Sequence, residues 1–226
     1  MYMSRAKLLP IAVSNNGLWK YMGNNYNVHR LVWSLFSGGS DNTRNFLYRQ
    51  ESNGKLPTFY IVSEEKPDDK SGLWDLDIKP YNPVLKSGQN LYFSIRANPI
   101  VSKRDENGKQ HRHDVVMDEK LRIKKENPNK VCMDVSEIVQ NKGVEWLQKR
   151  SDSYGFSIDT NRVRADGYKS HKFYKAKGKH YINISTIDFN GILTINDPEL
   201  FKKALYHGIG PAKGFGCGLL LVRPVR

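Results

Sequence analysis

The sequence predicts an α+β fold, in which β-sheets are covered by helices. Runs rich in Val, Ile, Tyr and Phe, bounded by Gly, Asn, Pro or Asp, recur along the 226 residues and are typical of strands. Segments with apolar residues at helical spacing lie between them. The composition agrees, because 38% hydrophobic and 11% aromatic residues are too many for a disordered chain. Strands and helices interleaved in this way favour sheets with helices packed on them.

Six strands are expected. The first is the N-terminal segment, where a short apolar stretch broken by Pro10 only faintly resembles a signal peptide and is better explained as a strand. The other five have the same composition and boundaries. The expected strands are Met1–Ile11, Phe46–Gln50, Thr58–Ser63, Leu91–Ala97, His180–Ile187 and Gly218–Pro224.

Three helices are expected. The clearest is Tyr26–Phe36, with apolar residues at i, i+3, i+4, i+7 and i+8 and with Asn24 or Asn25 available as N-cap. The second is Val135–Lys149. The third is Pro198–His207, which Asp197 caps and Pro198 opens at the first helical position. The apolar stripe of the first helix consists of Val28, Leu31, Val32, Leu35 and Phe36.

Two other segments bear on domain organisation. Residues 102–130 are charged and poorly periodic, with a turn at Asn107-Gly108, and are interpreted as a long loop or partly mobile insertion. A boundary between two small domains is expected near Lys86–Asn90, where Ser87-Gly88 marks a turn. The expected domains are therefore residues 1–88 and 89–226.

The charge indicates a polyanionic partner. The formal net charge is +13, of which +3 lies in residues 1–90 and +10 in residues 91–226. An ordinary basic surface is the alternative. No basic amphipathic helix and no apolar run of ~18 residues favours a membrane. Two isolated cysteines, Cys132 and Cys217, fit a reducing, cytoplasmic setting and exclude a zinc ribbon or disulfide scaffold.

A glycine-rich loop follows the third expected helix, from Gly208 to Gly218. It is neither a P-loop nor a dinucleotide fingerprint, because no GxxxxGK[ST] occurs and the order is helix, loop, strand. Either the glycines make a tight helix-to-strand turn, or the loop contacts nucleic acid through its backbone and Lys213. The candidate residues are Gly208, Gly210, Gly216, Gly218 and Lys213.

A second candidate site lies on the first expected helix. Tyr26 and His29 are i, i+3 neighbours, so both side chains can reach one target, and Arg30 is adjacent. His29 falls near the edge of the apolar stripe. A lone helical histidine is more often structural or solvated, and the basic setting shifts the balance towards function without deciding it.

A third candidate is the basic segment 162–179. Its cations alternate with aromatic residues, which suits RNA because cations meet phosphates and rings stack on unpaired bases. Gly167 and Gly178 flank a plausible pair of short strands, and a solvated hairpin is the alternative. The candidate RNA-binding cations are Arg162, Arg164, Lys169, Lys172, Lys175 and Lys177, and the interleaved rings are Tyr168, His171, Phe173 and Tyr174.

No metal or other cofactor is expected. His111-Arg112-His113 lacks a carboxylate or thiolate partner at ligand spacing, and the acid cluster of a two-metal nuclease is missing. A serine hydrolase is disfavoured because GxSxG does not occur.

These motifs together resemble the CasE endoribonuclease family of type I-E CRISPR systems, a branch of the RAMP superfamily. The string from Gly208 to Gly218 matches GxGxxxxxGxG without a gap, and its continuation to Leu220 is close to the CasE form. The resemblance covers nearly the whole chain and is weakest over residues 102–178. The other matching blocks are Leu91–Ile100, Gly191–Asp197, Phe46–Tyr48 and the Tyr-x-x-His of Tyr26 and His29.

The resemblance implies two tandem ferredoxin-like (RRM-like) domains and cleavage of CRISPR precursor RNA at the base of a repeat hairpin, without metal. It also implies that the mature guide RNA stays bound and that the enzyme remains a subunit of the Cascade complex. The matching catalytic positions are His29 and Tyr26, with Arg30 as a candidate phosphate contact. In such cleavage the ribose 2′-OH attacks the phosphorus and leaves 2′,3′-cyclic phosphate and 5′-OH ends. Which of the two residues is the acid stays open, and a non-catalytic guide-holding RAMP subunit is the alternative.

Overall fold

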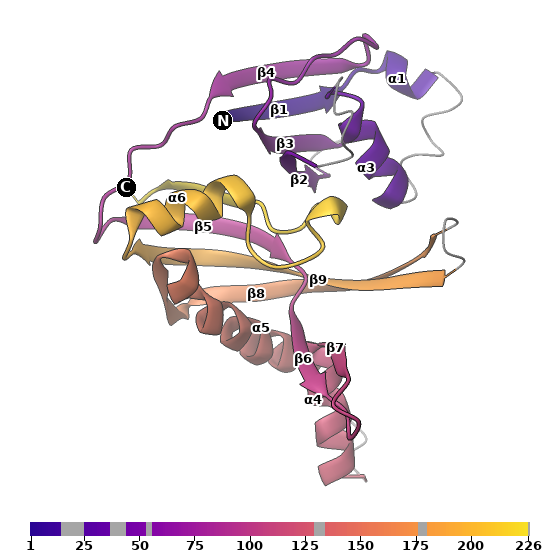
Figure 1. Cartoon of the computed structure of the whole chain (residues 1–226), viewed down its shortest axis with the longest axis vertical. Helices are drawn as coiled ribbons and strands as arrows, with labels where there is room; N and C mark the ends of the chain where they lie inside the picture. The colour runs from indigo at the N-terminus through magenta and orange to yellow at the C-terminus, as the bar shows by residue number, and fades with distance from the viewer. Residues whose placement is uncertain (15–24, 37–43, 53–55, 129–133, 176–179, 226) are drawn as a thin grey trace.

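The fold consists of two four-stranded antiparallel sheets and a two-stranded hairpin (Figure 1). The computed structural model describes residues 1–14, 25–36, 44–52, 56–128, 134–175 and 180–225. One sheet draws its strands from residues 2–80 and the other from residues 90–224. Each sheet has its own buried apolar cluster. The division into domains at residues 88 and 89 stays a prediction.

The first sheet has the strand order β2-β3-β1-β4. Along β1 the side chains alternate, with Ser4, Ala6 and Leu8 buried and Arg5 and Lys7 exposed, as expected for a strand with one covered face. Helix α3 lies against this sheet and shares its apolar cluster. The elements are β1 (Tyr2–Leu8), α1 (Ile11–Ser14), α3 (Asn25–Trp33), β2 (Phe46–Glu51), β3 (Thr58–Ser63) and β4 (Trp74–Pro80).

Strand β4 was not expected from the sequence. Trp74, Leu76 and Ile78 do alternate with polar residues, but aspartates at 75 and 77 are unfavourable in strands and only Trp74 is fully buried. The strand forms because it pairs with β1 over seven residues at the edge of the sheet.

The second sheet has the strand order β10-β5-β9-β8 and the chain order βαββαβ of a ferredoxin-like domain. The carboxylates of Asp134 and Asp197 accept backbone N–H bonds and cap the two main helices, as predicted for the second of them. The elements are β5 (Asn90–Ala97), α5 (Val135–Ser151), η1 (Asp152–Tyr154), β8 (Phe156–Lys175), β9 (His180–Ile195), α6 (Pro198–His207), η2 (Lys213–Phe215) and β10 (Leu220–Pro224). The predicted α+β, tandem ferredoxin-like fold class is confirmed.

The expectation of a loop over residues 102–130 was wrong. Those residues that the structure describes form strands β6 (Ile100–Arg104) and β7 (Gln110–Asp114) and helix α4 (Val115–Glu126), which project from the second sheet (Figure 1). Only Val115 and Val116 are buried in α4, so the sequence carries almost no apolar period. The Asp114 carboxylate caps this helix by accepting from the backbone N–H of Met117.

The described part of the basic segment, residues 162–175, lies within one long strand, where a pair of short strands was expected. Strand β8 pairs with β9 from Phe156 to Lys175, with register shifts at 158–163 and 166–169. Gly167 lies in the second shift with a φ of +63° and therefore marks a bulge within the strand. The shifts disturb the two-residue alternation that would reveal a continuous strand. Gly178 lies outside the described residues, as do Asn24 and Cys132.

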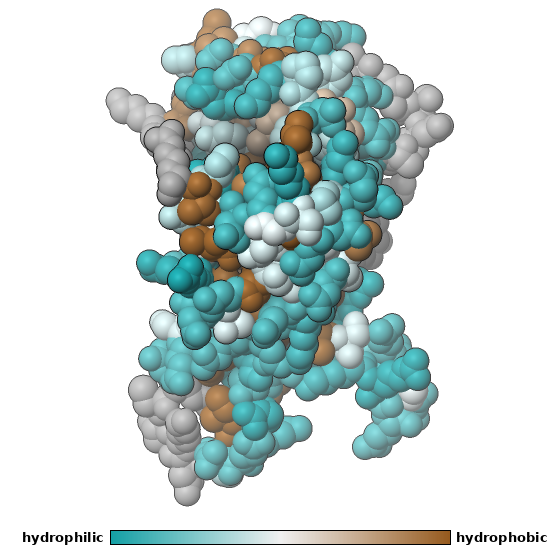
Figure 2. Space-filling view, turned by 90° about the vertical axis from the view of Figure 1, so that its left-hand side faces the viewer, coloured by the Kyte–Doolittle hydropathy of each residue, from teal (hydrophilic) through white to brown (hydrophobic). Residues whose placement is uncertain are grey.

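The surface is mostly hydrophilic on the face in Figure 2, with small hydrophobic patches. Among the described residues, no helix is both long and apolar enough to cross a membrane.

Candidate active site

His29 lies on α3 at the margin of the first core. Val28, Leu31 and Val32 are buried, and this anchors the helix so that His29 is left half-buried beside them. Aromatic rings pack around its imidazole: Trp33 edge-on with centroids 5.4 Å apart, and Phe46 stacked at 6.1 Å. The Tyr48 ring lies 6.3 Å away at a tilt. Packing therefore holds the imidazole in a defined orientation.

The glycine-rich loop comes up to His29 from the second sheet. The Tyr48 hydroxyl, on β2, donates to the Gly214 carbonyl at 3.1 Å. A Cβ placed on Gly214 would lie 3.1 Å from Nη1 of Arg44 and 3.9 Å from Cε1 of His29. Helix α3, the start of β2 and the loop thus converge, and they place Arg44, His29 and the loop backbone next to one another.

The electrostatics of this cluster favour a neutral histidine beside cations. Burial, and then the positive charge of Arg44, lower the pKa of His29 below 6.5. The same two causes lower the pKa of Lys213. The His29 Nδ1 atom is buried and has no hydrogen-bond partner among the described residues. At pH 7 the imidazole is therefore mostly in its basic form, near two groups able to attract a phosphate.

Two buried groups next to this cluster, the Tyr48 phenol and the Cys217 thiol, stay un-ionised at neutral pH. Burial raises the pKa of the Tyr48 phenol well above its usual range, so it stays protonated and donates its hydrogen bond. Burial also raises the pKa of the Cys217 thiol to about 12, which leaves it un-ionised. The sequence assigned no role to Arg44 or Tyr48, because Arg44 belongs to no motif and Tyr48 entered only as part of the matching block Phe46–Tyr48.

Three of the four candidate loop glycines are buried. Gly208 and Gly218 lie against each other, since a Cβ on either would come within 2.8 Å of a backbone oxygen of the facing segment. A Cβ on Gly216 would lie 3.3 Å from the Tyr48 ring. Close packing requires glycine at these positions, as in the turn alternative considered from the sequence. RNA contact by these three glycines stays a prediction. Gly210 and Lys213 are half-buried, and for them RNA contact stays a prediction.

The other α3 candidates stay predictions. Tyr26 lies in the first turn of α3, three residues before His29, but its side chain is outside the described part of the structure. Arg30 is exposed in the last turn.

The candidate cations of the basic segment are divided between two faces of the second sheet. Lys169 pairs with Thr186 and His171 with Ile184, on the face that looks towards the first sheet. Lys172 alternates to the opposite face, where its ammonium lies 4.7 Å from the centre of the Tyr181 ring. Lys175 lies in β8 without a described side chain, and Lys177 is outside the described residues.

Arg162 and Arg164 are both exposed and paired with neighbours on their own strand. Arg162 lies 3.4 Å from Asp159, and Arg164 lies 2.6 Å from Asp166. Exposed pairs of this kind contribute little to stability and leave the guanidinium groups accessible to a phosphate.

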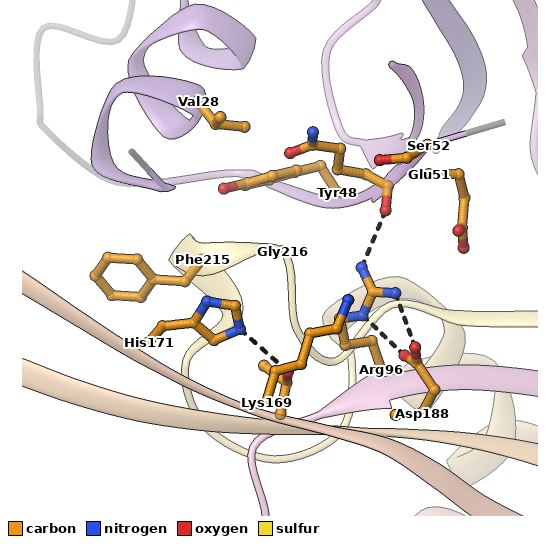
Figure 3. A pocket seen from close by; sticks show the side chains of 13 residues that line it. Val28, Tyr48, Glu51, Ser52, Arg96, Lys169, His171, Asp188, Phe215 and Gly216 are labelled. Atoms are coloured by element: carbon orange, nitrogen blue, oxygen red, sulfur yellow. Dashed lines mark hydrogen bonds and ion pairs between the residues drawn. The ribbon is translucent and has the colours of Figure 1, made fainter. Parts of the chain in front are cut away.

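A cavity of about 360 Å³ lies between the two sheets, next to the His29 cluster (Figure 3). Arg96 on β5 crosses it: two nitrogens bind the Asp188 carboxylate at 2.8 Å each, and Nη1 donates to the Gln50 carbonyl at 3.1 Å. This side chain therefore joins the second sheet to the end of β2. The sequence had drawn attention to Arg96 only through the family resemblance of its segment.

No group of three or more His, Cys, Asp or Glu side chains with the arrangement of a metal site occurs in the part of the chain that the structure describes. His111 instead binds Asp105 at 2.8 Å.

Known proteins match this chain along almost its whole length. The Cascade subunit CasE of Escherichia coli K12 is 28% identical over 202 residues, covering 88% of this chain and 92% of that protein. The endoribonuclease Cse3 of Thermus thermophilus is 26% identical over 226 residues, covering 90% and 92%. A structure of Cse3 bound to a 19-nucleotide RNA superposes with a TM-score of 0.72 at 25% identity, covering 99% and 100%. Cas6e of E. coli K-12 shares the fold, with a TM-score of 0.60 at 24% identity over the full length of both chains.

The family model described as "CRISPR associated protein" matches residues 1–224. Because that match spans nearly every residue, and because the matched relatives carry the CasE and Cse3 names, this chain belongs to the CRISPR-associated protein family and is a CasE-type member of it.

Proposed function

We propose that this protein is a metal-independent endoribonuclease that cleaves CRISPR precursor RNA within its hairpin repeats. In this proposal the mature guide RNA stays bound, and the protein serves as a subunit of a type I-E Cascade complex. The relatives support the reaction class and the partners, since one is named an endoribonuclease and another a Cascade subunit. The observation that carries the chemistry is the half-buried, neutral His29 set between Arg44 and the loop of Lys213.

In the proposed mechanism His29 accepts the proton of the ribose 2′-OH as that oxygen attacks the adjacent phosphorus. A lowered pKa suits this role, because the imidazole must be unprotonated before the reaction. Negative charge then develops on the phosphorane oxygens, and the cations of Arg44 and Lys213 stabilise it. The 5′-oxygen leaves and takes up a proton, which Tyr26, one helical turn before His29, is proposed to supply.

The RNA itself is bound by cations outside this cluster in the proposal. Each phosphate neutralised by Lys or Arg releases condensed counterions, so affinity should fall steeply as salt increases. The cations proposed to contact the RNA are Arg30, Arg162, Arg164, Lys169, Lys172, Lys175 and Lys177, with Lys213 shared between binding and chemistry.

The test is a comparison of cleavage and binding in two matched histidine variants, with a 5′-labelled repeat hairpin in excess chelator. His29→Ala should lower the single-turnover cleavage rate by about 10²–10⁴-fold while the Kd for the hairpin changes little. His207→Ala, which removes an exposed histidine at the end of another helix, should leave both unchanged.

Three outcomes would count against the proposal. Equal loss of binding and cleavage in His29→Ala would make His29 structural. Cleavage that appears only with added magnesium would overturn metal independence. Tight binding without any cut by the unmodified protein would assign the non-catalytic guide-holding role.

A further inference from the structure

The cavity between the sheets is adjacent to the His29 cluster, and Tyr48 forms a common wall. One side of the Tyr48 ring faces His29 at 6.3 Å between centroids, and the same side chain lines the cavity. Val28, next to His29 in the helix, and Phe215, next to Gly214 in the loop, line it too. A ribonucleotide chain whose phosphate meets His29 would therefore carry a neighbouring nucleotide to the cavity mouth.

The two sites differ in how their charged side chains are paired. Beside His29 lie the cations of Arg44 and Lys213, which suit a phosphate. In the cavity, Arg96 is paired with Asp188, and Glu51 is paired with Arg49 at 2.5 Å, so the Lys169 ammonium is left without an ion pair among the described residues. Each of the three guanidinium nitrogens of Arg96 donates one hydrogen bond, two of them to Asp188 and one to Gln50. A polar lining with one unpaired ammonium and several hydrogen-bonding groups can contact the edge of a nucleobase.

The remaining polar groups could read the edge of a base. His171 and Lys169 point from β8 into the space below Tyr48 (Figure 3). Nε2 of His171 lies 3.3 Å from Oγ1 of Thr186, which fixes the ring and leaves Nδ1 for another partner. The Lys169 ammonium has no ion pair among the described residues and offers three donors to base oxygens or ring nitrogens.

We propose that this cavity binds one unpaired base of the RNA, close to the scissile phosphate, with Lys169 and His171 contacting its edge. The proposal rests on the proposed function, which supplies the RNA. The size agrees, because pockets for small ligands span about 300–1,000 Å³ and this one holds about 360 Å³. Holding a base here would keep the adjacent backbone in line with His29, so Lys169 and His171 are specificity and positioning residues.

The test compares RNA binding by side-chain variants of the cavity with binding of RNAs that lack single bases. We would measure the Kd of a set of repeat RNAs, each of which has one abasic nucleotide within about three positions of the cut, the distance that the cavity can span. The full-length protein carries His29→Ala in this experiment, so that the RNA stays intact. One abasic position should weaken binding roughly tenfold. With Lys169→Ala and His171→Ala added, intact and abasic RNA should bind equally.

Lys172→Ala is the matched control, because Lys172 is a cation of the same strand on the opposite face. It should weaken intact and abasic RNAs by the same factor, and Lys79→Ala, an exposed cation on β4, should change neither. Thermal melting of each variant checks that it folds. If each abasic position weakens RNA binding by the same factor with and without Lys169 and His171, the cavity does not bind a base.

The two proposals can fail separately. In one case the unmodified protein cleaves the repeat, but the effect of each abasic position is the same with and without Lys169 and His171. Only the cavity proposal is then overturned. If the unmodified protein binds the repeat without cutting it, the proposed reaction is overturned. The binding measurements with abasic RNAs then still show whether the cavity holds a base.

Discussion

Replacing Gly208 by alanine tests whether the glycine-rich loop is required for packing. Gly208 has φ +75° and ψ 167°, a region that only glycine occupies readily, at a cost of about 1–3 kcal/mol for other residues. The new Cβ would lie 2.8 Å from the Gly218 carbonyl oxygen and 2.9 Å from Cδ1 of Leu47. Overpacking of this kind adds a cost of about 1–3 kcal/mol. Gly208→Ala should therefore lower the free energy of unfolding by about 2–6 kcal/mol, measured by urea denaturation.

Gly88→Ala is the matched control for this prediction. Gly88 also has a positive φ, +78°, but nothing lies within 4 Å of a Cβ placed there. It should lose only the backbone cost, about 1–2 kcal/mol. Equal losses in the two variants would refute the packing argument. A Gly208→Ala protein with full stability and weakened RNA binding would instead support direct RNA contact by this glycine.

Three further outcomes follow from the site. The single-turnover cleavage rate should rise with pH to a plateau, with an inflection below pH 6.5. Arg44→Gln should move that inflection to higher pH, because the charge of Arg44 helps to lower the His29 pKa. A cleavage rate that falls with pH through this range would make His29 the acid. The melting temperature should decline as pH falls below 6.5, because the unfolded chain binds a proton at His29 at a higher pH than the folded protein does. His29→Gln should reduce this decline, measured between about pH 7.5 and about pH 5. Asp188→Asn should cost about 2 kcal/mol in urea denaturation, since Arg96 is only 28% exposed and would lose its carboxylate; no change would mean that the pair contributes nothing.

Much of the fold could be predicted where the sequence carries a period or a cap. The stripe from Val28 to Leu35 packs into the first core, and the Asp197-Pro198 start of α6 occurs at the predicted residue. The projecting hairpin and α4 could not be predicted in this way. Their side chains are mostly charged, and the few buried ones, Val115 and Val116, are adjacent in sequence and show no period.

The candidate site could be predicted only as far as its motifs reach. His29 and Lys213 belong to recognisable strings, but Arg44 belongs to none and approaches His29 only because β2, α3 and the loop converge. The cations of the basic segment were predicted as one group, and the pleat of β8 and its bulges direct Lys169 and Lys172 to opposite faces. Side-chain direction in a bulged strand depends on pairing with β9, which composition does not encode.

The central claim, attack by the ribose 2′-OH with His29 as base, is tested most directly by one substituted substrate. A repeat hairpin with a single 2′-deoxy nucleotide immediately upstream of the cut is incubated with the unmodified protein in excess chelator, beside the all-ribose hairpin. We expect both RNAs to bind equally and only the all-ribose hairpin to be cut, with an upstream product that ends in a 2′,3′-cyclic phosphate. Cleavage of the 2′-deoxy substrate at the same position would rule out attack by the 2′-OH, because that RNA has no hydroxyl next to the scissile phosphate.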